Sequence, residues 1–583
     1  MKRKLALVLA MLMLLTLATA CGAKTSPSPS TDAGGATASP AATTPAATTP
    51  AATTAPPASA APAGPKNLTI QLGPDTETID PAINSSVDGA NYIIFAFEGL
   101  LTVDKDGKIA PGQAETWEKS ADGLTWTFHL RDGLKWSDGT PLTANDFVYS
   151  WKRMADPATA APYASTVLSM VVGFDKANAD SANIDQLGVS APDDHTFVVN
   201  LTWPCPYFDR LAAFASLFPV QQATVEANGD AWAASPATYI SNGPFMLTDW
   251  VPGSYLLFSK NPNYWNADAV KLDTIKCLLI EDDNASLAAY QSGTAQMIKS
   301  IPSGEIDALS KTADYHLDPI LGTYYIDLNT SLDMFKDSRV REALSLAIDR
   351  IYVAGTLMQN TYMPAGNFVG PGVADWDGSD FYSNANGGKP YIDVNTYDAN
   401  LAQAKQLMAD AGYPNGKGFP TLKYSFNDTG YHKVVAEYLQ QAWGQLGINV
   451  ELSVEDWASF LPMRRVGDYV ASRDGWVCDY NDPSNILELR ETGNGNNAGS
   501  QGTPDKGYSN KDFDAAMQQS RTLTDPQQRW AALHQAEDVL MKDAGVIPVA
   551  YYADFYLIQP NAVTGWWHSP DGFWHFEFAD LAA

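Results

Sequence analysis

The sequence predicts an α/β fold with more than one domain, on three observations. The chain has 583 residues, too many for a single hydrophobic core. From residue 66 onward, strand and helix patterns are mixed along the chain rather than segregated. In the later half they alternate regularly, which favours a parallel sheet built from βαβ units. We therefore expect a parallel sheet in that half of the molecule.

Residues 1–21 have the pattern of an export signal. Basic residues at positions 2–4 precede an apolar run from Leu5 to Leu15, and small residues lead to Cys21. A cysteine in this position resembles a bacterial lipobox, in which a diacylglycerol is attached to the thiol. We expect a lipoprotein signal peptide over 1–21 and lipidation of Cys21; plain secretion is the alternative.

The next segment, 22–65, contains almost only Ala, Thr, Pro, Ser and Gly. It has too little apolar surface to offset the entropy of ordering, so we expect a disordered tether.

Composition excludes some classes of partner. The net charge of −29 and the pI of about 4.4 do not suit nucleic acid or an anionic lipid surface. The three remaining cysteines, Cys205, Cys277 and Cys478, have no zinc or redox spacing and allow at most one disulfide.

Periodicity and capping residues identify elements in the first half of the folded part. They are a strand over 67–72, a helix over 90–100, a strand over 124–130, a helix from the capping box at Thr143 and Asp146 to Met154, and a hairpin over 245–260.

The later half supplies the regular alternation. It comprises a strand over 421–426, a helix over 431–446 stopped by Gly447, a strand over 448–454, a helix over 456–465 and a strand over 469–472. The Gly- and Asn-rich stretch 492–506 is predicted to be a loop.

Ligands of open parallel sheets bind outside the carboxyl ends of the strands. His432, Trp457 and Arg473 each follow one of the predicted strands closely. Arg464 is seven residues beyond Trp457 in one helix, so the two share a face. We expect these four side chains to converge on one rim. The ordinary alternatives are surface charges for the arginines, a helix cap for His432 and core packing for Trp457.

Asp479 follows the last of these strands, close in sequence to Arg464 and Arg473. A carboxylate and a set of cations held apart on one scaffold suit a ligand that is positive at one end and negative at the other. A free extended peptide is such a ligand. The alternative for Asp479 is a capped turn in the segment 479–483.

The sequence does not predict an enzyme. It contains no His-Glu-x-x-His, no Gly-x-Ser-x-Gly and no Walker loop, and its seven histidines lack ligand spacing. Asp282 and Asp283 could mimic the carboxylate pair of a glycosidase, but adjacency in sequence says little about the distance between two carboxyl groups in space. We expect no catalytic residues, no metal and no cofactor.

A long motif from Trp126 to Trp151 resembles the signature of the oligopeptide and dipeptide solute-binding proteins of bacterial ABC importers. Shorter matches lie at 239–245, 261–265, 339–344 and 479–483, so the resemblance extends from about Lys66 to the C-terminus. It is closest to the oligopeptide-binding members of the family.

The resemblance implies a two-lobed periplasmic-binding-protein-like fold of type II, cluster C, with an extra inserted domain and the ligand enclosed between the lobes. Lobe I would combine 66–98, 222–323 and 549–583. The inserted domain would be 99–221, and lobe II would be 324–548.

The resemblance also implies roles for individual residues. In that family, the residue at the position of Asp479 pairs with the peptide ammonium. The residues at the positions of Arg464, Arg473 and His432 meet the peptide carboxylate, and the length of the peptide decides which of them does so. Tyr163 and Trp457 match residues that line side-chain pockets, while Val87, Gly475 and Val477 match residues that offer backbone hydrogen bonds. Some relatives have a disulfide at the positions of Gly322 and Val477; neither is cysteine here, so we expect no bridge.

The implied function is capture of short peptides and their delivery to the permease and ATPase subunits of an ABC transporter. The protein would be a monomer held by the lipid on Cys21 at the outer face of the cytoplasmic membrane. The alternatives are the same fold binding a dipeptide, a nickel chelate, haem or an oligosaccharide, or a receptor that senses peptides.

Overall fold

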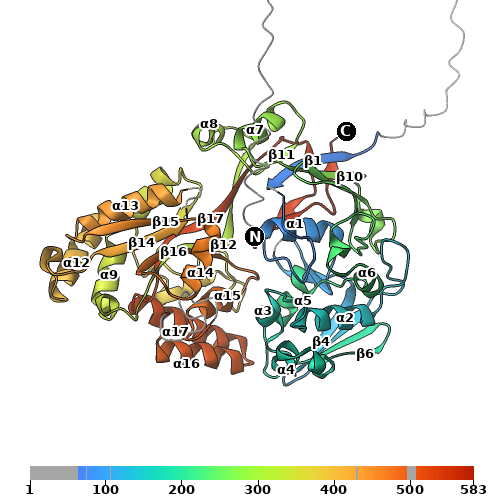
Figure 1. The fold of residues 1–583 in the computed structure, drawn as a ribbon, viewed down its shortest axis with the longest axis horizontal. Helices are drawn as coiled ribbons and strands as arrows, with labels where there is room; N and C mark the ends of the chain where they lie inside the picture. The colour runs from blue at the N-terminus through green and yellow to red at the C-terminus, as the bar shows by residue number, and fades with distance from the viewer. Residues whose placement is uncertain (1–63, 74, 106, 428–430, 495–506, 583) are drawn as a thin grey trace, which may run out of the picture. The chain divides into compact units, whose positions relative to one another are not determined.

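The computed structural model describes residues 64–582 except 74, 106, 428–430 and 495–506 (Figure 1). The predicted signal peptide, Cys21 and nearly all of the predicted tether lie outside the described residues. So does most of the predicted loop at 492–506.

A mixed sheet of eleven strands organises the described chain. Its order is β15-β14-β16-β12-β17-β11-β1-β10-β9-β8, with β13 added beside β17. The strands are β1 (Asn67–Gly73), β8 (Phe245–Val251), β9 (Tyr255–Lys260), β10 (Thr274–Leu279), β11 (Met297–Ile298), β12 (Tyr315–Leu328), β13 (Met363–Pro364), β14 (Leu422–Asn427), β15 (Val450–Glu455), β16 (Ala471–Val477) and β17 (Ile547–Ile558).

Two long strands, β12 and β17, join the two ends of this sheet (Figure 1). They pair antiparallel from Tyr315 opposite Leu557 to Ile326 opposite Ile547. One end of β12 contributes to a core with Tyr324, Trp443 and Ile547. A separate, larger core contains buried residues from the first 280 positions together with residues from the C-terminal segment. The α/β class is thus confirmed, while the domain boundaries stay a prediction.

The regular alternation predicted for the later half is confirmed. Strands β14 and β15 pair in parallel, and β14 also pairs in parallel with β16. Helix α13 (His432–Gly444) lies between β14 and β15 in the chain, and α14 (Trp457–Arg465) between β15 and β16. Gly447 has φ of +83°, and a Cβ there would lie 2.1 Å from the carbonyl oxygen of Asn415, so only glycine suits this turn.

One boundary in this region was wrong. The last strand was predicted to end at Ser472, but β16 continues to Val477. It continues because its other edge pairs with β12, from Ala471 opposite Leu328 to Val477 opposite Gly322. Arg473 therefore lies inside the strand rather than after it.

The first-half predictions differ from the structure mainly at one helix. Helix α1 (Val87–Ala96) is capped by Ser86 and ends before Leu100, the predicted last residue, because the backbone at Phe97 is already extended. Leu100 is buried in the core. Helix α2 (Ala144–Ala155) has the predicted capping box, and β8 and β9 form the predicted hairpin.

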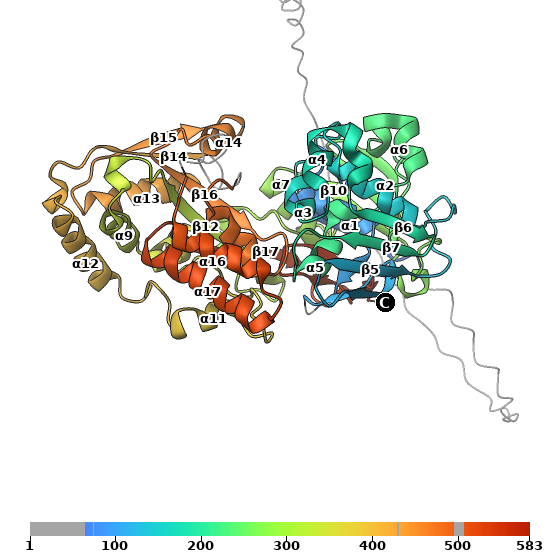
Figure 2. The same cartoon turned by 90° about the horizontal axis from the view of Figure 1, so that it is seen from below.

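A four-stranded sheet accompanies α2. Its order is β4-β5-β7-β6, and Figure 2 shows β5, β6 and β7 near that helix. The strands are β4 (Ala114–Lys119), β5 (Thr125–Leu130), β6 (Val189–Asp193) and β7 (Thr196–Asn200).

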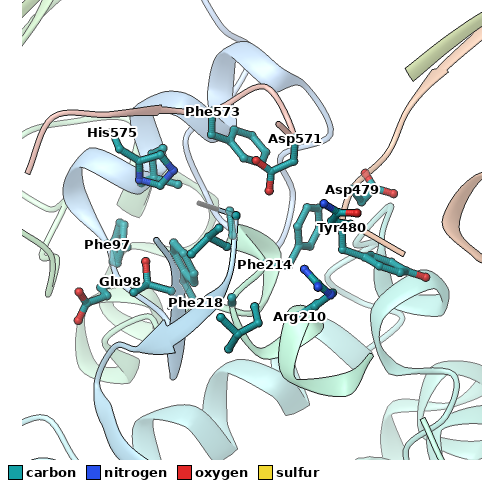
Figure 3. Close-up of a pocket in the computed structure, with 18 of the residues that line it drawn as sticks. Phe97, Glu98, Arg210, Phe214, Phe218, Asp479, Tyr480, Asp571, Phe573 and His575 are labelled. Atoms are coloured by element: carbon teal, nitrogen blue, oxygen red, sulfur yellow. The ribbon is translucent and has the colours of Figure 1, made fainter. Parts of the chain in front are cut away.

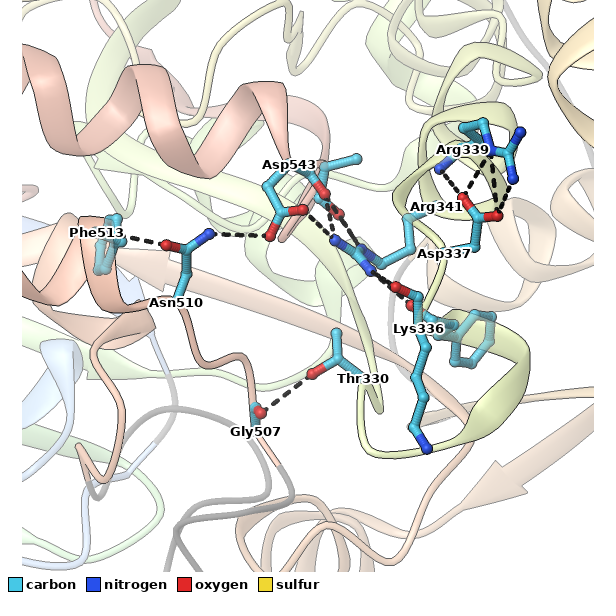
Figure 4. Close-up of polar contacts among 11 residues, drawn as sticks. Thr330, Lys336, Asp337, Arg339, Arg341, Gly507, Asn510, Phe513 and Asp543 are labelled. Carbon is cyan, nitrogen blue, oxygen red and sulfur yellow. Dashed lines mark hydrogen bonds and ion pairs between the residues drawn. The ribbon is translucent and has the colours of Figure 1, made fainter. Parts of the chain in front are cut away.

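A buried arginine ties α9 (Ser338–Leu346) to the end of α17 (Pro526–Lys542). The guanidinium of Arg341 donates to the backbone and side-chain oxygens of Asp543, both at 2.6 Å, and to the carbonyl of Phe335 at 2.6 Å (Figure 4). The motif at 339–344 is therefore placed to stabilise the fold.

The remaining α-helices are α3 (Ala164–Leu168), α4 (Phe174–Ala179), α5 (Phe208–Ala212), α6 (Gln222–Asn228), α7 (Asp283–Gln291), α8 (Ile306–Leu309), α10 (Arg350–Tyr352), α11 (Phe381–Asn384), α12 (Tyr397–Asp410), α15 (Pro483–Leu487) and α16 (Lys511–Thr522). Short strand pairs are β2 (Leu101–Val103) with β3 (Ile109–Pro111), β18 (Val563–Thr564) with β21 (Asp580–Leu581), and β19 (Trp567–His568) with β20 (Trp574–His575). Within the described ranges, no helix is both long and apolar enough to cross a membrane.

Candidate functional site

Strand β16 has an edge that no other strand occupies along most of its length. One edge pairs with β12 over all seven residues. The other pairs with β14 only at Ala471 and Ser472. Among the described residues, no strand pairs with this edge from Arg473 to Val477. The exposed backbone groups of such an edge form a template for an added strand.

Asp479 lies just beyond one end of this edge, where the sequence placed it. Its carboxylate accepts a hydrogen bond from the Tyr163 hydroxyl at 3.1 Å and one from Asn485 Nδ2 at 3.3 Å. The Asp479 N–H donates to Asn485 Oδ1 at 3.0 Å. Asn485 belongs to α15, whose position therefore fixes that of Asp479.

No basic side chain among the described residues forms an ion pair with Asp479. The pKa of its carboxyl group is raised to about 6: burial is the main cause, the hydrogen bonds from Asn485 and Tyr163 oppose the rise, and the nearby charge of Asp571 adds a smaller contribution to it. Asp479 is thus a carboxylate that the protein orients and does not neutralise.

Arg473 lies at the other end of the free edge. Its Nη2 donates to the Tyr552 hydroxyl at 3.2 Å, and its guanidinium lies 5.2 Å from the centre of the Tyr324 ring. Its Nε is buried without a hydrogen-bond partner. Within the described part of the chain, no carboxylate pairs with Arg473. Its charge is therefore available to an anionic group.

Arg464 is in a different situation. Its guanidinium forms an ion pair with Asp474, whose side chain is 1% exposed. Burial lowers the pKa of Arg464. Because Asp474 already balances its charge, Arg464 is less suited than Arg473 to hold a ligand carboxylate.

His432 begins α13 and packs against the Tyr324 ring, with ring centres 5.5 Å apart. Burial, together with the nearby charge of Arg473, lowers the pKa of His432 to about 3. The imidazole is therefore neutral at pH 7, and its buried Nδ1 has no hydrogen-bond partner among the described residues. A neutral imidazole exchanges hydrogen bonds with a ligand but supplies no cation.

The remaining predicted residues surround this edge in part. Gly475 and Val477 belong to it, and a Cβ on Gly475 would meet the Tyr552 hydroxyl at 2.2 Å. Tyr163 reaches Asp479, as described. Val87 is 40% exposed at the start of α1. Trp457 begins α14, which places its backbone before Arg464 in one helix, as predicted.

A partly open cavity of about 70 Å³ extends from Asp479 (Figure 3). It has room for a few water molecules. Its walls include the aromatic side chains of Phe97, Phe214, Phe218 and Phe573. Asp479, Tyr480 and Asp571 lie on one side of the close-up, and Glu98 lies on the opposite side.

The cysteines supply no chemistry to this site. Cys205, Cys277 and Cys478 are buried and free. Gly322 and Val477 face each other in the β12–β16 ladder, and neither position is a cysteine in this chain. Among the described side chains, no group of three acids, histidines or cysteines is placed to hold a metal ion.

Sequence reasoning missed the residues that set the charge state of the site. Asp474 neutralises Arg464, Tyr552 orients Arg473, and Asn485 orients Asp479. The sequence did contain a clue to Asp474. Neighbouring residues of a strand face opposite sides, so Asp474 could be predicted to face away from Arg473. Tyr552 belongs to β17, and nothing in the nearby sequence indicates that its side chain reaches Arg473 in β16.

The fold and this site now define a class of protein. Residues 108–498 match the model of bacterial extracellular solute-binding proteins, family 5 middle. The chain belongs to this family.

Particular relatives are similar over most of the chain. Periplasmic oligopeptide-binding protein OppA of Escherichia coli is 35% identical, covering 84% of this chain and 87% of its own length. Oligopeptide-binding protein OppA of Bacillus subtilis is 33% identical, covering 85% and 90%. These matches confirm the resemblance inferred from the motifs.

Solved structures support the same conclusion. Haemophilus influenzae OppA in complex with RPPGFSPFR has a TM-score of 0.72 at 31% identity, covering 89% of this chain and all of that chain. The murein tripeptide binding protein MppA of E. coli has a TM-score of 0.74 at 31% identity, covering 89% and 99%. The two-lobed, type II periplasmic-binding-protein-like fold is thereby confirmed.

Proposed function

We propose that the protein captures short peptides as an added strand on the free edge of β16 and delivers them unchanged to an ABC permease. The free edge from Arg473 to Val477 carries this proposal. Main-chain hydrogen bonds to such an edge give affinity that does not depend on ligand side chains. Five residues of edge span roughly 17 Å, which suits a ligand of a few residues.

The charges at the two ends of the edge support a ligand with free termini. Asp479 is an oriented carboxylate without a cation, and Arg473 is a cation without a carboxylate. An extended peptide places its ammonium at one end and its carboxylate at the other. We therefore assign the ammonium to Asp479 and the carboxylate to Arg473, with Arg464 and His432 in supporting positions.

Relatives give the proposal independent support. H. influenzae OppA was solved as a complex with the peptide RPPGFSPFR, and Listeria monocytogenes OppA was solved bound to peptide. The permease and ATPase subunits of an ABC importer are the partners that this family implies. A lipid on Cys21 would hold the protein at the outer face of the cytoplasmic membrane, where ligands arrive, and the protein would act there as a monomer.

Mass spectrometry of ligand retained on purification, followed by calorimetric titration, tests the proposal. We expect short peptides with free termini to be retained and to bind, while nickel chelates, haem and oligosaccharides do not. A bile acid is a useful further competitor, because the probable deoxycholate-binding protein YgiS is 32% identical to this chain. Binding of any of these solutes in preference to peptides would contradict the proposal.

A further inference from the structure

A second carboxylate, that of Asp571, lines the cavity that begins at Asp479. Asp571 lies in the turn between β19 and β20. The N–H of Leu321 donates to the carbonyl of Pro570 at 2.7 Å, and the N–H of Cys478 donates to the carbonyl of Leu321 at 2.6 Å. The backbone of Leu321 thus holds together the residues that immediately precede Asp571 and Asp479.

The protein leaves both carboxylates without a counter-charge. Oδ1 of Asp571 is buried and has no hydrogen-bond partner in the part of the chain that the structure describes. Among the described residues, neither Asp571 nor Asp479 forms an ion pair. Arg210 lines the same cavity, but among the described residues no ion pair joins it to either carboxylate.

The surroundings make this arrangement costly without a ligand. The nearby charge of Asp571 adds a small contribution to the rise in the pKa of Asp479 that burial causes. Four phenylalanines, Phe97, Phe214, Phe218 and Phe573, line the cavity together with polar residues that include Glu98, Arg210 and Glu577 (Figure 3). A carboxylate that is partly withdrawn from water is stabilised by a paired cation, and one ligand ammonium compensates only one of the two.

We propose that Asp571 accepts a second positive charge from the ligand, so that the site favours peptides whose first residue is lysine or arginine. The inference rests on the proposed function, which places the ligand ammonium at Asp479. A basic side chain of the first residue starts beside that ammonium and enters the cavity with its apolar stem against the aromatic walls. Its cationic head then meets Asp571.

The test compares two tetrapeptides that differ only at the first side chain: Lys-Ala-Ala-Ala and norleucine-Ala-Ala-Ala. Norleucine keeps the length and apolar stem and removes the charge. On the wild-type protein we expect the lysine peptide to bind about tenfold more tightly by calorimetry, and the ratio to shrink at 0.5 M salt because the charges are screened. Equal affinity of the two peptides would overturn the inference.

Variants assign the preference to Asp571. In Asp571→Asn we expect the ratio to fall to about one while the norleucine peptide keeps its affinity. Asp132→Asn is the matched control, since the Asp132 side chain is fully exposed, and it should keep the ratio. An Asp571→Asn protein that retains the full preference for the lysine peptide would contradict the assignment. It would also be contradicted if Glu-Ala-Ala-Ala bound the wild-type protein more tightly than Lys-Ala-Ala-Ala and Arg210→Gln removed that difference.

The outcomes also separate this inference from the proposed function. If the norleucine and lysine peptides both bind with equal affinity, peptide capture stands and the role of Asp571 fails. If the wild-type protein binds neither peptide, the proposed function itself fails.

Discussion

At the scale of residues, two arginines that look alike in the sequence have different roles. Arg464 is balanced by the buried Asp474, whereas Arg473 contacts Tyr552 and Tyr324 and has no carboxylate partner among the described residues. The side chain of Asp474 is 1% exposed, so it depends on Arg464 for compensation. We therefore expect Arg464 to contribute mainly to stability and Arg473 mainly to binding.

Replacing each arginine by glutamine separates these contributions. Arg464→Gln leaves a buried carboxylate unpaired and should lower the free energy of unfolding by about 3–5 kcal/mol, measured by denaturant titration. Arg473→Gln should leave stability nearly unchanged and weaken free peptides on the order of thirtyfold, measured by calorimetry. A C-amidated peptide is the control, because it lacks the carboxylate and should lose little. Equal losses for both peptides would refute the assignment of Arg473.

Binding should also depend on pH through Asp479. Its pKa is raised to about 6 in the free protein, so the carboxylate is ionised above that value and protonated below it. Because the ionised carboxylate pairs only with a protonated amino terminus, affinity should be highest near pH 7 and should fall again above about pH 8, where the α-ammonium of the ligand loses its proton. It should fall by up to about tenfold per pH unit below pH 6.

Two controls identify the group that titrates. Asp479→Asn should remove most of this dependence, and an N-acetylated peptide should show little of it on the wild type. A fall of the same size in the Asp479→Asn protein would show that Asp479 is not the group responsible.

At the scale of elements, the free edge of β16 makes a prediction about the ligand backbone. In a strand, successive N–H groups point to opposite sides, so every second ligand amide faces the edge. N-methylation of those amides in a tetrapeptide should weaken binding by about two- to tenfold, whereas N-methylation of the intervening amide should matter less. Calorimetry on the methylated series measures this. A uniform loss at every position would mean that the ligand does not bind as a strand.

Local signals predicted many of these elements. The capping box at Thr143, the hairpin over 245–260 and the strand–helix alternation after residue 421 are all set by nearby residues, and all are found. The end of β16 was missed because β12, which extends it, is about 150 residues away in the chain. Long-range pairing leaves no periodic pattern in the strand that receives it.

At the scale of the whole molecule, sequence analysis predicted the fold class and the position of Asp479 beyond a strand, and the comparisons confirmed the family. The charge balance of the site could not be predicted. It depends on Asp474, Tyr552 and Asp571, which come from separate segments that only the three-dimensional fold brings together. Motif matching predicts the positions around the ligand, whereas the contacts show which of the predicted side chains lack a counter-charge among the described residues.

The central claim is that a peptide ammonium pairs with Asp479, and a double cycle of Asp479→Asn against N-acetylation of the ligand tests it most directly. For a free tetrapeptide, removing the carboxylate should weaken binding on the order of a hundredfold, because the ammonium is left enclosed and unpaired. The N-acetylated peptide should already bind weakly to the wild-type protein and lose little from the substitution. If free and acetylated peptides bind the wild-type protein equally tightly, Asp479 does not hold an amino terminus, and the account is contradicted.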